Sequence, residues 1–138
     1  MKKFIAPVLL FTLLPLSLSQ AGAAAQRAPA LVTIAVDLDV PAVNTKYGKV
    51  GGFVPWVAEV HVGDRVRFIN VDDEAHTATS VGIADDKPHG DRLSAAWSSG
   101  RLASEATSRT FLADKAGVYR YRCMIHAAQG QRGVIVVR

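Results

Sequence analysis

The chain has 138 residues, a formal net charge of +4 and one cysteine. This length predicts a single domain, and the small net charge argues against nucleic-acid binding, which usually needs a basic stripe on one face. One cysteine excludes an internal disulfide framework.

The first segment has the pattern of a secretory signal peptide. Two lysines precede an almost wholly apolar run over residues 4–18, and small residues follow it. The run is shorter than the roughly 20 residues that a membrane span needs. We expect a signal peptide over residues 1–25, with Ala23 or Ala25 as the last residue removed, and an exported mature domain over residues 26–138. The mature protein is expected in the periplasm or outside the cell, without stable membrane insertion.

The mature chain consists of short apolar or alternating segments separated by turn residues. Residues 41–52, which contain proline, asparagine and glycine, predict a loop. Seven or eight short strands at near-regular spacing predict an all-β Greek-key β-sandwich. The segments expected as strands lie at 31–38, 56–62, 65–70, 75–81, 107–112, 118–123 and 134–137.

Three residues form a candidate metal site. Cys123 and His126 are three residues apart where a predicted strand ends, so a thiolate and an imidazole can chelate one ion. His76 lies 47 residues before Cys123, and the loops at one end of a Greek-key sandwich gather together. Two imidazoles and a thiolate are the donor set of blue-copper sites. Zinc accepts the same donors with a water, and a buried free cysteine remains a further alternative.

The sequence around these residues resembles the small cupredoxins, such as plastocyanin, pseudoazurin and amicyanin. The segment DDEAHT at residues 72–77 is similar to their first ligand loop, and residues 118–136 are similar to their C-terminal ligand loop and last strand. The resemblance covers roughly residues 53–138. It implies that His76, Cys123 and His126 are the equatorial ligands of one copper ion, which alternates between Cu(I) and Cu(II).

The fourth ligand departs from the usual family pattern. Gln131 stands where most members have methionine, two residues before Gly133. It therefore resembles the axial glutamine of stellacyanin-like proteins, and an amide oxygen favours Cu(II) over Cu(I). Gln129 is an alternative by a shorter loop count. Met124 is expected to point elsewhere, because it is directly next to Cys123 in a strand.

Three further polar residues lie near the predicted strands and loops. Asn70 ends a predicted strand shortly before His76, where it can either tune the thiolate or bond to its own backbone. His61 lies within a predicted strand and is expected to face the surface. His89 lies in a loop with three aspartates, where a solvated loop is favoured over a second metal site.

The resemblance implies a one-electron carrier with an unidentified redox protein as partner. A monomer is expected, and His126 is the expected electron exit. No acid–base pair or open coordination position is evident, so an enzyme is not predicted. The alternatives are a copper-binding or copper-delivery protein that uses the same ligands, and a small zinc module.

Overall fold

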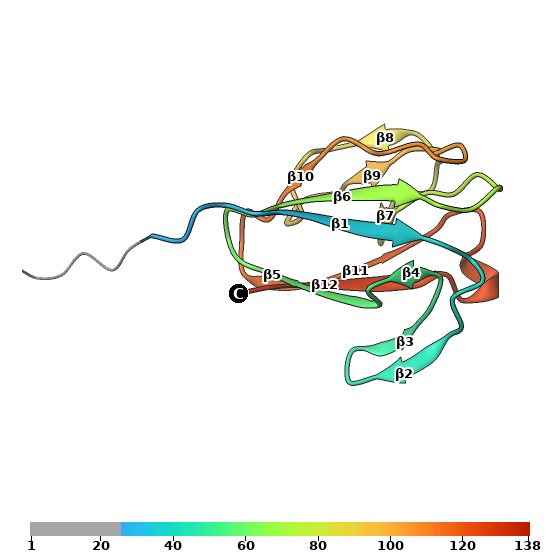
Figure 1. Cartoon of the computed structure of the whole chain (residues 1–138), viewed down its shortest axis with the longest axis horizontal. Coiled ribbons are helices and arrows are strands. Elements are labelled where there is room, and N and C mark those ends of the chain that lie inside the picture. Colours follow the sequence, from blue (N-terminus) through green and yellow to red (C-terminus); the bar gives the residue numbers. More distant parts are fainter. Residues whose placement is uncertain (1–25) are drawn as a thin grey trace, which may run out of the picture.

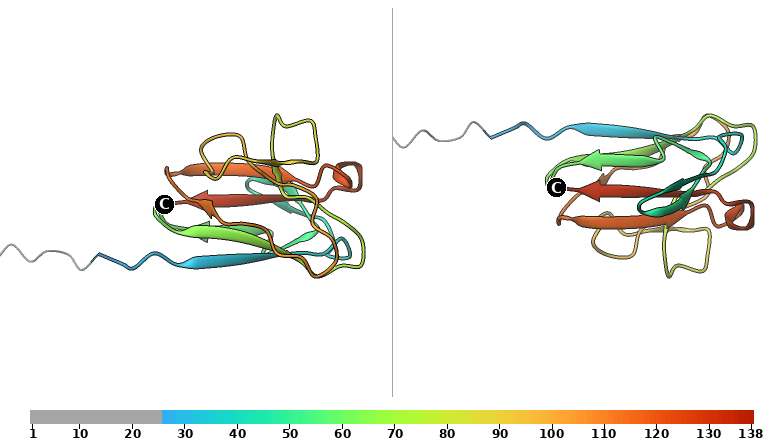
Figure 2. Two further views of the ribbon diagram at one scale, coloured as in Figure 1. Left: turned by 90° about the horizontal axis from the view of Figure 1, so that it is seen from above. Right: turned by 90° about the horizontal axis from the view of Figure 1, so that it is seen from below.

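The computed structural model describes residues 26–138, and the predicted signal peptide over residues 1–25 lies outside the described residues. Two sheets pack face to face (Figures 1 and 2), and a two-stranded hairpin lies beside them. The first sheet has the order β10-β6-β1-β4. Its strands are β1 (Leu31–Val36), β4 (Phe53–Val54), β6 (Arg65–Asn70) and β10 (Phe111–Leu112).

The second sheet has the order β5-β12-β11-β7-β9-β8. Strands β1 and β6 are parallel, as are β5 and β12, and the other neighbours are antiparallel. This architecture confirms the predicted all-β sandwich, although several strands have only two residues. The strands are β5 (Val57–Val60), β7 (Thr79–Ser80), β8 (Pro88–His89), β9 (Ser98–Ser99), β11 (Gly117–Arg122) and β12 (Arg132–Val137).

Alternation along the strands builds the core between the sheets. In β11, Tyr119 and Tyr121 face the core, whereas Arg120 and Arg122 alternate with them and face outward. Tyr121 packs edge-on against Phe53, with ring centroids 4.7 Å apart, and against Phe68 at 5.2 Å. Such aromatic pairs add stability beyond the area that they bury. The strand that carries Cys123 at its end is therefore held rigidly.

Residues 41–52 do not form the predicted loop. They contain the hairpin of β2 (Val43–Thr45) and β3 (Gly48–Val50). Val50 packs on Val134 and Val136, on the outer face of β12. The prediction was wrong because the strands are only three residues long and depend on this tertiary contact.

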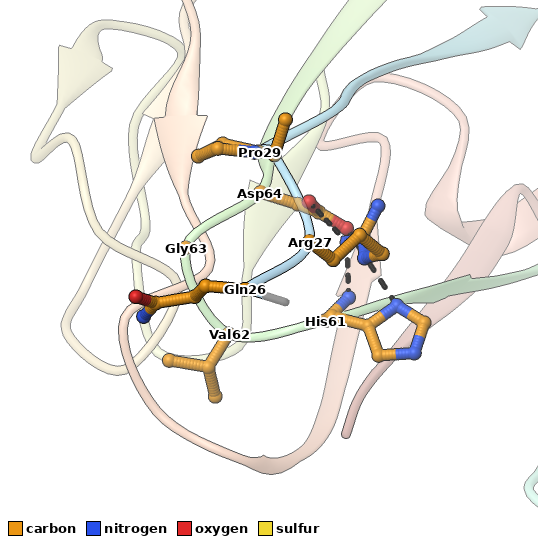
Figure 3. Close-up of a pocket in the computed structure, with 8 residues that line it drawn as sticks. Gln26, Arg27, Pro29, His61, Val62, Gly63 and Asp64 are labelled. Atoms are coloured by element: carbon orange, nitrogen blue, oxygen red, sulfur yellow. Dashed lines mark hydrogen bonds and ion pairs between the residues drawn. The ribbon is translucent and has the colours of Figure 1, made fainter. Parts of the chain in front are cut away.

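Asp64 ties the N-terminal segment to the turn between β5 and β6 (Figure 3). Its carboxylate accepts hydrogen bonds from the N–H groups of Ala30 and His61, at 2.8 Å each, and pairs with Arg27. Burial alone raises the pKa of Asp64. These hydrogen bonds and the guanidinium of Arg27 outweigh burial and hold the pKa below its ordinary value.

Two segments lie beyond the opposite end of the sandwich, where β6 and β11 end (Figure 1). One is residues 71–78, which follow β6. The other is residues 123–131, which join β11 to β12 and include the short 3₁₀ helix η1 (Ala127–Gln129). Within residues 26–138, no helix is long and apolar enough to cross a membrane.

Candidate metal centre

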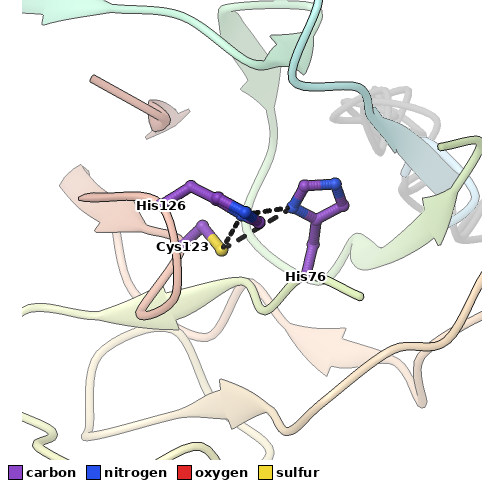
Figure 4. A group of neighbouring side chains, drawn as sticks. All are labelled: His76, Cys123 and His126. Atoms are coloured by element: carbon purple, nitrogen blue, oxygen red, sulfur yellow. Dashed lines mark hydrogen bonds between the residues drawn. The ribbon is translucent and has the colours of Figure 1, made fainter. Parts of the chain in front are cut away.

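Three side chains converge between these two segments (Figure 4). The Sγ atom of Cys123 lies 3.8 Å from Nδ1 of His76 and 3.7 Å from Nδ1 of His126, and the two nitrogens are 3.0 Å apart. Cys123 and His76 are fully buried, and His126 is 8% exposed. The predicted convergence of the two loops is therefore present in the structure.

The triangle of donor atoms has the size that one metal ion needs. An ion about 2.3 Å from sulfur and about 2.0 Å from each nitrogen, in a trigonal arrangement, requires S···N separations of about 3.7 Å. The separations of 3.7 and 3.8 Å meet this requirement, whereas the N···N separation of 3.0 Å is shorter than the roughly 3.5 Å of an ideal trigonal arrangement. Among residues 26–138, this is the one group of three or more His, Cys, Asp or Glu residues with metal-binding spacing.

A carboxylate stands behind each imidazole. Nε2 of His76 lies 2.9 Å from Oδ2 of Asp72, and Nε2 of His126 lies 3.1 Å from Oε2 of Glu74. An Nε2–H that donates to a carboxylate leaves the lone pair on Nδ1, which is the atom that faces Cys123. The two carboxylates therefore favour the tautomer that can ligate a metal.

Asp72 also links the ligand loop to the segment that follows β1. Its Oδ2 accepts a hydrogen bond of 3.1 Å from the N–H of Leu38. This bond, followed by the one from His76, holds the pKa of Asp72 below its ordinary value. Sequence reasoning did not single out Asp72 or Glu74. The available signal was their spacing, because Asp72 and Glu74 lie four and two positions before the proposed ligand His76.

Asn70 organises the backbone of the first ligand loop. Its side-chain amide donates to the carbonyls of Glu74 at 2.7 Å and Leu102 at 3.0 Å, and its Oδ1 accepts from the N–H of Asp72. His76 and Leu102 also exchange two backbone hydrogen bonds. Of the two interpretations from sequence, the structure favours the backbone role.

The sulfur of Cys123 receives a backbone donor. The N–H of Thr77 lies 3.4 Å from Sγ, and the Oγ1 of Thr77 accepts from the N–H of Met124 at 2.8 Å. An N–H directed at the sulfur stabilises negative charge on it. Thr77 therefore connects the first ligand loop to Cys123 and Met124 of the second.

Gln131 is buried next to the ligands, whereas Gln129 is exposed. The backbone of Gln131 bonds to Cys123 and His126, and its Nε2 donates to the carbonyl of Gly52 at 3.2 Å. Its Oε1 is buried without a hydrogen-bond partner. A buried acceptor without a partner is costly, and a metal ion would satisfy it.

The other two histidines lie apart from the cluster. His61 is at the opposite end of the sandwich, 3.9 Å from Asp64, with an exposed side chain (Figure 3). His89 pairs with Asp85 at 2.7 Å, and the neighbouring Asp86 pairs with Arg101 instead. Both histidines lie away from the three converging residues, as predicted. Their local structure was predicted wrongly, because His61 follows β5 (Val57–Val60) and His89 belongs to the short strand β8 (Pro88–His89).

Comparison with known proteins identifies the architecture. No family model and no curated protein matches the sequence. Among solved structures, a purple cupredoxin from Nitrosopumilus maritimus matches with a TM-score of 0.54 and 22% identity, over 78% of this chain and 99% of the other. An amicyanin variant in its Cu(I) form matches with a TM-score of 0.50 and 26% identity, over 77% of this chain and 82% of the other.

This chain has the cupredoxin fold. Within that fold, the cluster of His76, Cys123 and His126 fits a blue-copper site. The buried Gln131 beside it is compatible with such a site. The structural neighbours thus agree with the cupredoxin resemblance that the sequence alone indicated.

Proposed function

We propose that this protein is an exported type 1 copper protein that carries single electrons between redox partners. His76, Cys123 and His126 would be the equatorial ligands, and Gln131 the axial ligand. The supporting observation is the convergence of a buried thiol and two buried imidazole nitrogens within 4.8 Å. When bound, copper supplies a reversible one-electron change between Cu(I) and Cu(II).

The protein contributes a fixed arrangement of donors. Cys123 is held at the end of β11 by the N–H of Thr77, and both imidazoles are held by carboxylates. Donors that keep their places in both oxidation states reduce the rearrangement that electron transfer requires. His126 is the most exposed of the three ligands, so its ring edge would be the electron exit.

One of the structural neighbours also carries a glutamine. The amicyanin variant with 26% identity has a glutamine in place of a methionine and was determined with Cu(I). Here, the unpartnered Oε1 of Gln131 is available as a donor, whereas Gln129 faces solvent. We therefore assign the axial role to Gln131.

Copper delivery is the alternative function with the same ligands. Delivery requires donors that open readily to exchange copper with a partner. Cys123 and His76 are fully buried, and His126 is 8% exposed, which favours retention of the ion over exchange. Repeated voltammetric cycles without loss of copper would support the carrier, and loss of copper on reduction would support delivery.

The test of the metal site is an optical and EPR spectrum of the mature protein with added Cu(II). We expect an intense visible band that Cys123→Ser abolishes, because a hydroxyl does not replace the thiolate. His76→Ala and His126→Ala should weaken copper binding, whereas His61→Ala and His89→Ala should leave the spectrum unchanged. A colourless Cu(II) complex, or loss of the band in His89→Ala alone, would contradict the assignment.

Export is a separate part of the proposal, and it rests on the composition of residues 1–25. N-terminal sequencing of the exported protein should begin between residues 24 and 28. Retention of Met1 in a membrane fraction would contradict it.

A further inference from the structure

A groove lined by positive charge lies on the outer face of the second sheet. It has a volume of about 210 Å³, and its lining includes Lys49, Arg120, Arg122 and Arg132. Lys49 comes from the hairpin, and the three arginines come from β11 and β12. No acidic side chain lines this groove.

The four cations have no counter-ions within residues 26–138. None of them forms an ion pair, whereas Arg27, Arg101 and Arg138 each pair with a carboxylate. Arg120 donates only to the backbone carbonyl of Tyr47, at 3.1 Å. The Nε of Arg122 is buried without any partner. The groove therefore has unused hydrogen-bond donors as well as unbalanced charge.

The register between β11 and β12 places two of these positive charges opposite one another, which destabilises the protein when no anion is bound. Arg122 and Arg132 are direct cross-strand partners in the β11–β12 ladder. Like charges directly opposite one another are destabilising, and nothing in the described chain offsets this pair. An external anion between the two guanidinium groups would remove the repulsion and satisfy the donors.

The residues around the groove favour a protein surface over a small free anion as the occupant of the groove. Val81 lines the groove and is 69% exposed. A second hollow shares Val81 and Arg120 with this groove and extends along the same face to Val118, which is 43% exposed. Exposed apolar side chains among arginines are typical of protein interfaces. A small anion would use only the cationic part.

We propose that this groove docks an acidic partner protein, whose carboxylates bind between Arg122 and Arg132. Arg122 immediately precedes Cys123, and Arg132 immediately follows Gln131. A partner seated here contacts the chain one peptide unit from the proposed copper ligands. That the partner exchanges electrons rests on the proposed function, whereas the docking itself does not.

The test uses amide NMR spectra of the mature protein, titrated with a hexaglutamate peptide and, separately, with citrate. The metal-free protein and the Cu(I) form are both measured, so the result does not depend on redox activity. We expect the peptide to shift the amides of Lys49, Arg120, Arg122 and Arg132. Its affinity should fall at least about tenfold between about 20 and 200 mM salt.

The test variants each remove two positive charges, one pair from the groove and the control pair from the other sheet. Arg122→Gln with Arg132→Gln should weaken peptide binding at least about tenfold. Arg65→Gln with Arg67→Gln should leave peptide binding unchanged, because these arginines lie on β6 of the first sheet and do not line the groove. Their hydrogen bonds go to the hydroxyls of Thr110 and Thr33. Lys49→Gln with Arg120→Gln, at exposed positions, gives a second test if the first pair of changes disturbs folding.

Three results would overturn the proposal. Equal weakening in the two arginine pairs would show non-specific attraction. Shifts outside the groove would place the binding surface elsewhere. Citrate binding as tightly as the peptide would identify a small-anion site instead of a docking surface.

Discussion

The carboxylate of Glu74 lies 3.1 Å from Nε2 of His126, so a negative charge faces the ring edge of the most exposed proposed ligand. Asp72 stands in the same relation to the buried His76, at 2.9 Å. Both acids belong to the loop that follows β6. One short segment therefore supplies a ligand and orients two of them.

Replacing Glu74 by glutamine should raise the reduction potential of the copper-loaded protein. The variant keeps the shape of the side chain but removes the negative charge that favours Cu(II) over Cu(I). Glu74 is 67% exposed, so the shift should be some tens of millivolts, where about 59 mV is a tenfold change for one electron. High salt should reduce this shift in potential.

The measurement is voltammetry of Glu74→Gln beside the control Glu59→Gln, which changes an exposed ion pair with Arg138. Equal potentials in all three proteins would show that Glu74 only positions the ring.

Replacing Gln131 by methionine should also raise the potential, for a different reason. An amide oxygen stabilises Cu(II) more than a thioether does, and the visible spectrum should shift with the donor. The same change at the exposed Gln129 should leave both almost unchanged. A shift found only in Gln129→Met would transfer the axial role to Gln129. Unchanged potentials in both variants would mean that this loop supplies no axial side chain.

Gly52 should be required for the position of Gln131. A Cβ at Gly52 would lie 2.4 Å from Cγ of Gln131, and the residue has a φ of +72°. We expect Gly52→Ala to lower the free energy of unfolding by about 1–3 kcal/mol and to alter the copper spectrum. Gly48→Ala is the matched control, because Gly48 has a φ of +107° with no heavy atom within 4 Å of an added Cβ. It should lower stability without changing the spectrum. Identical spectra for both variants and the parent would contradict the role of Gly52.

Asp64 should make stability depend on pH at the acidic end. Because its pKa is lowered in the folded state, its contribution is present above the unfolded value of about 3.9. That contribution is lost as the pH falls through the folded value. The difference in unfolding free energy between the parent and Asp64→Asn should therefore be largest near pH 7 and shrink below about pH 4. Denaturant curves from pH 7 to pH 3 check this, and parallel curves would refute it.

The sequence was most informative where chemistry and spacing coincide. The Cys123-x₂-His126 spacing and the position of His76 after a strand predicted the three residues that converge, and alternation predicted the sandwich. The contacts of Asp72 and Glu74 with the two imidazoles could not be predicted, because these hydrogen bonds depend on how the loop folds back. The hairpin over residues 43–50 was missed because packing on Val134 stabilises it, and no local pattern reports that contact.

The complete burial of Cys123 also bears on the protein before it acquires metal. Oxidants and other thiols must reach a sulfur atom to convert it to a sulfenic acid or a mixed disulfide. Cys123 has no exposed surface, and His126 and Gln131 beside it are nearly as buried. The newly folded chain should therefore keep its one thiol reduced and resist covalent dimerisation until a metal ion arrives.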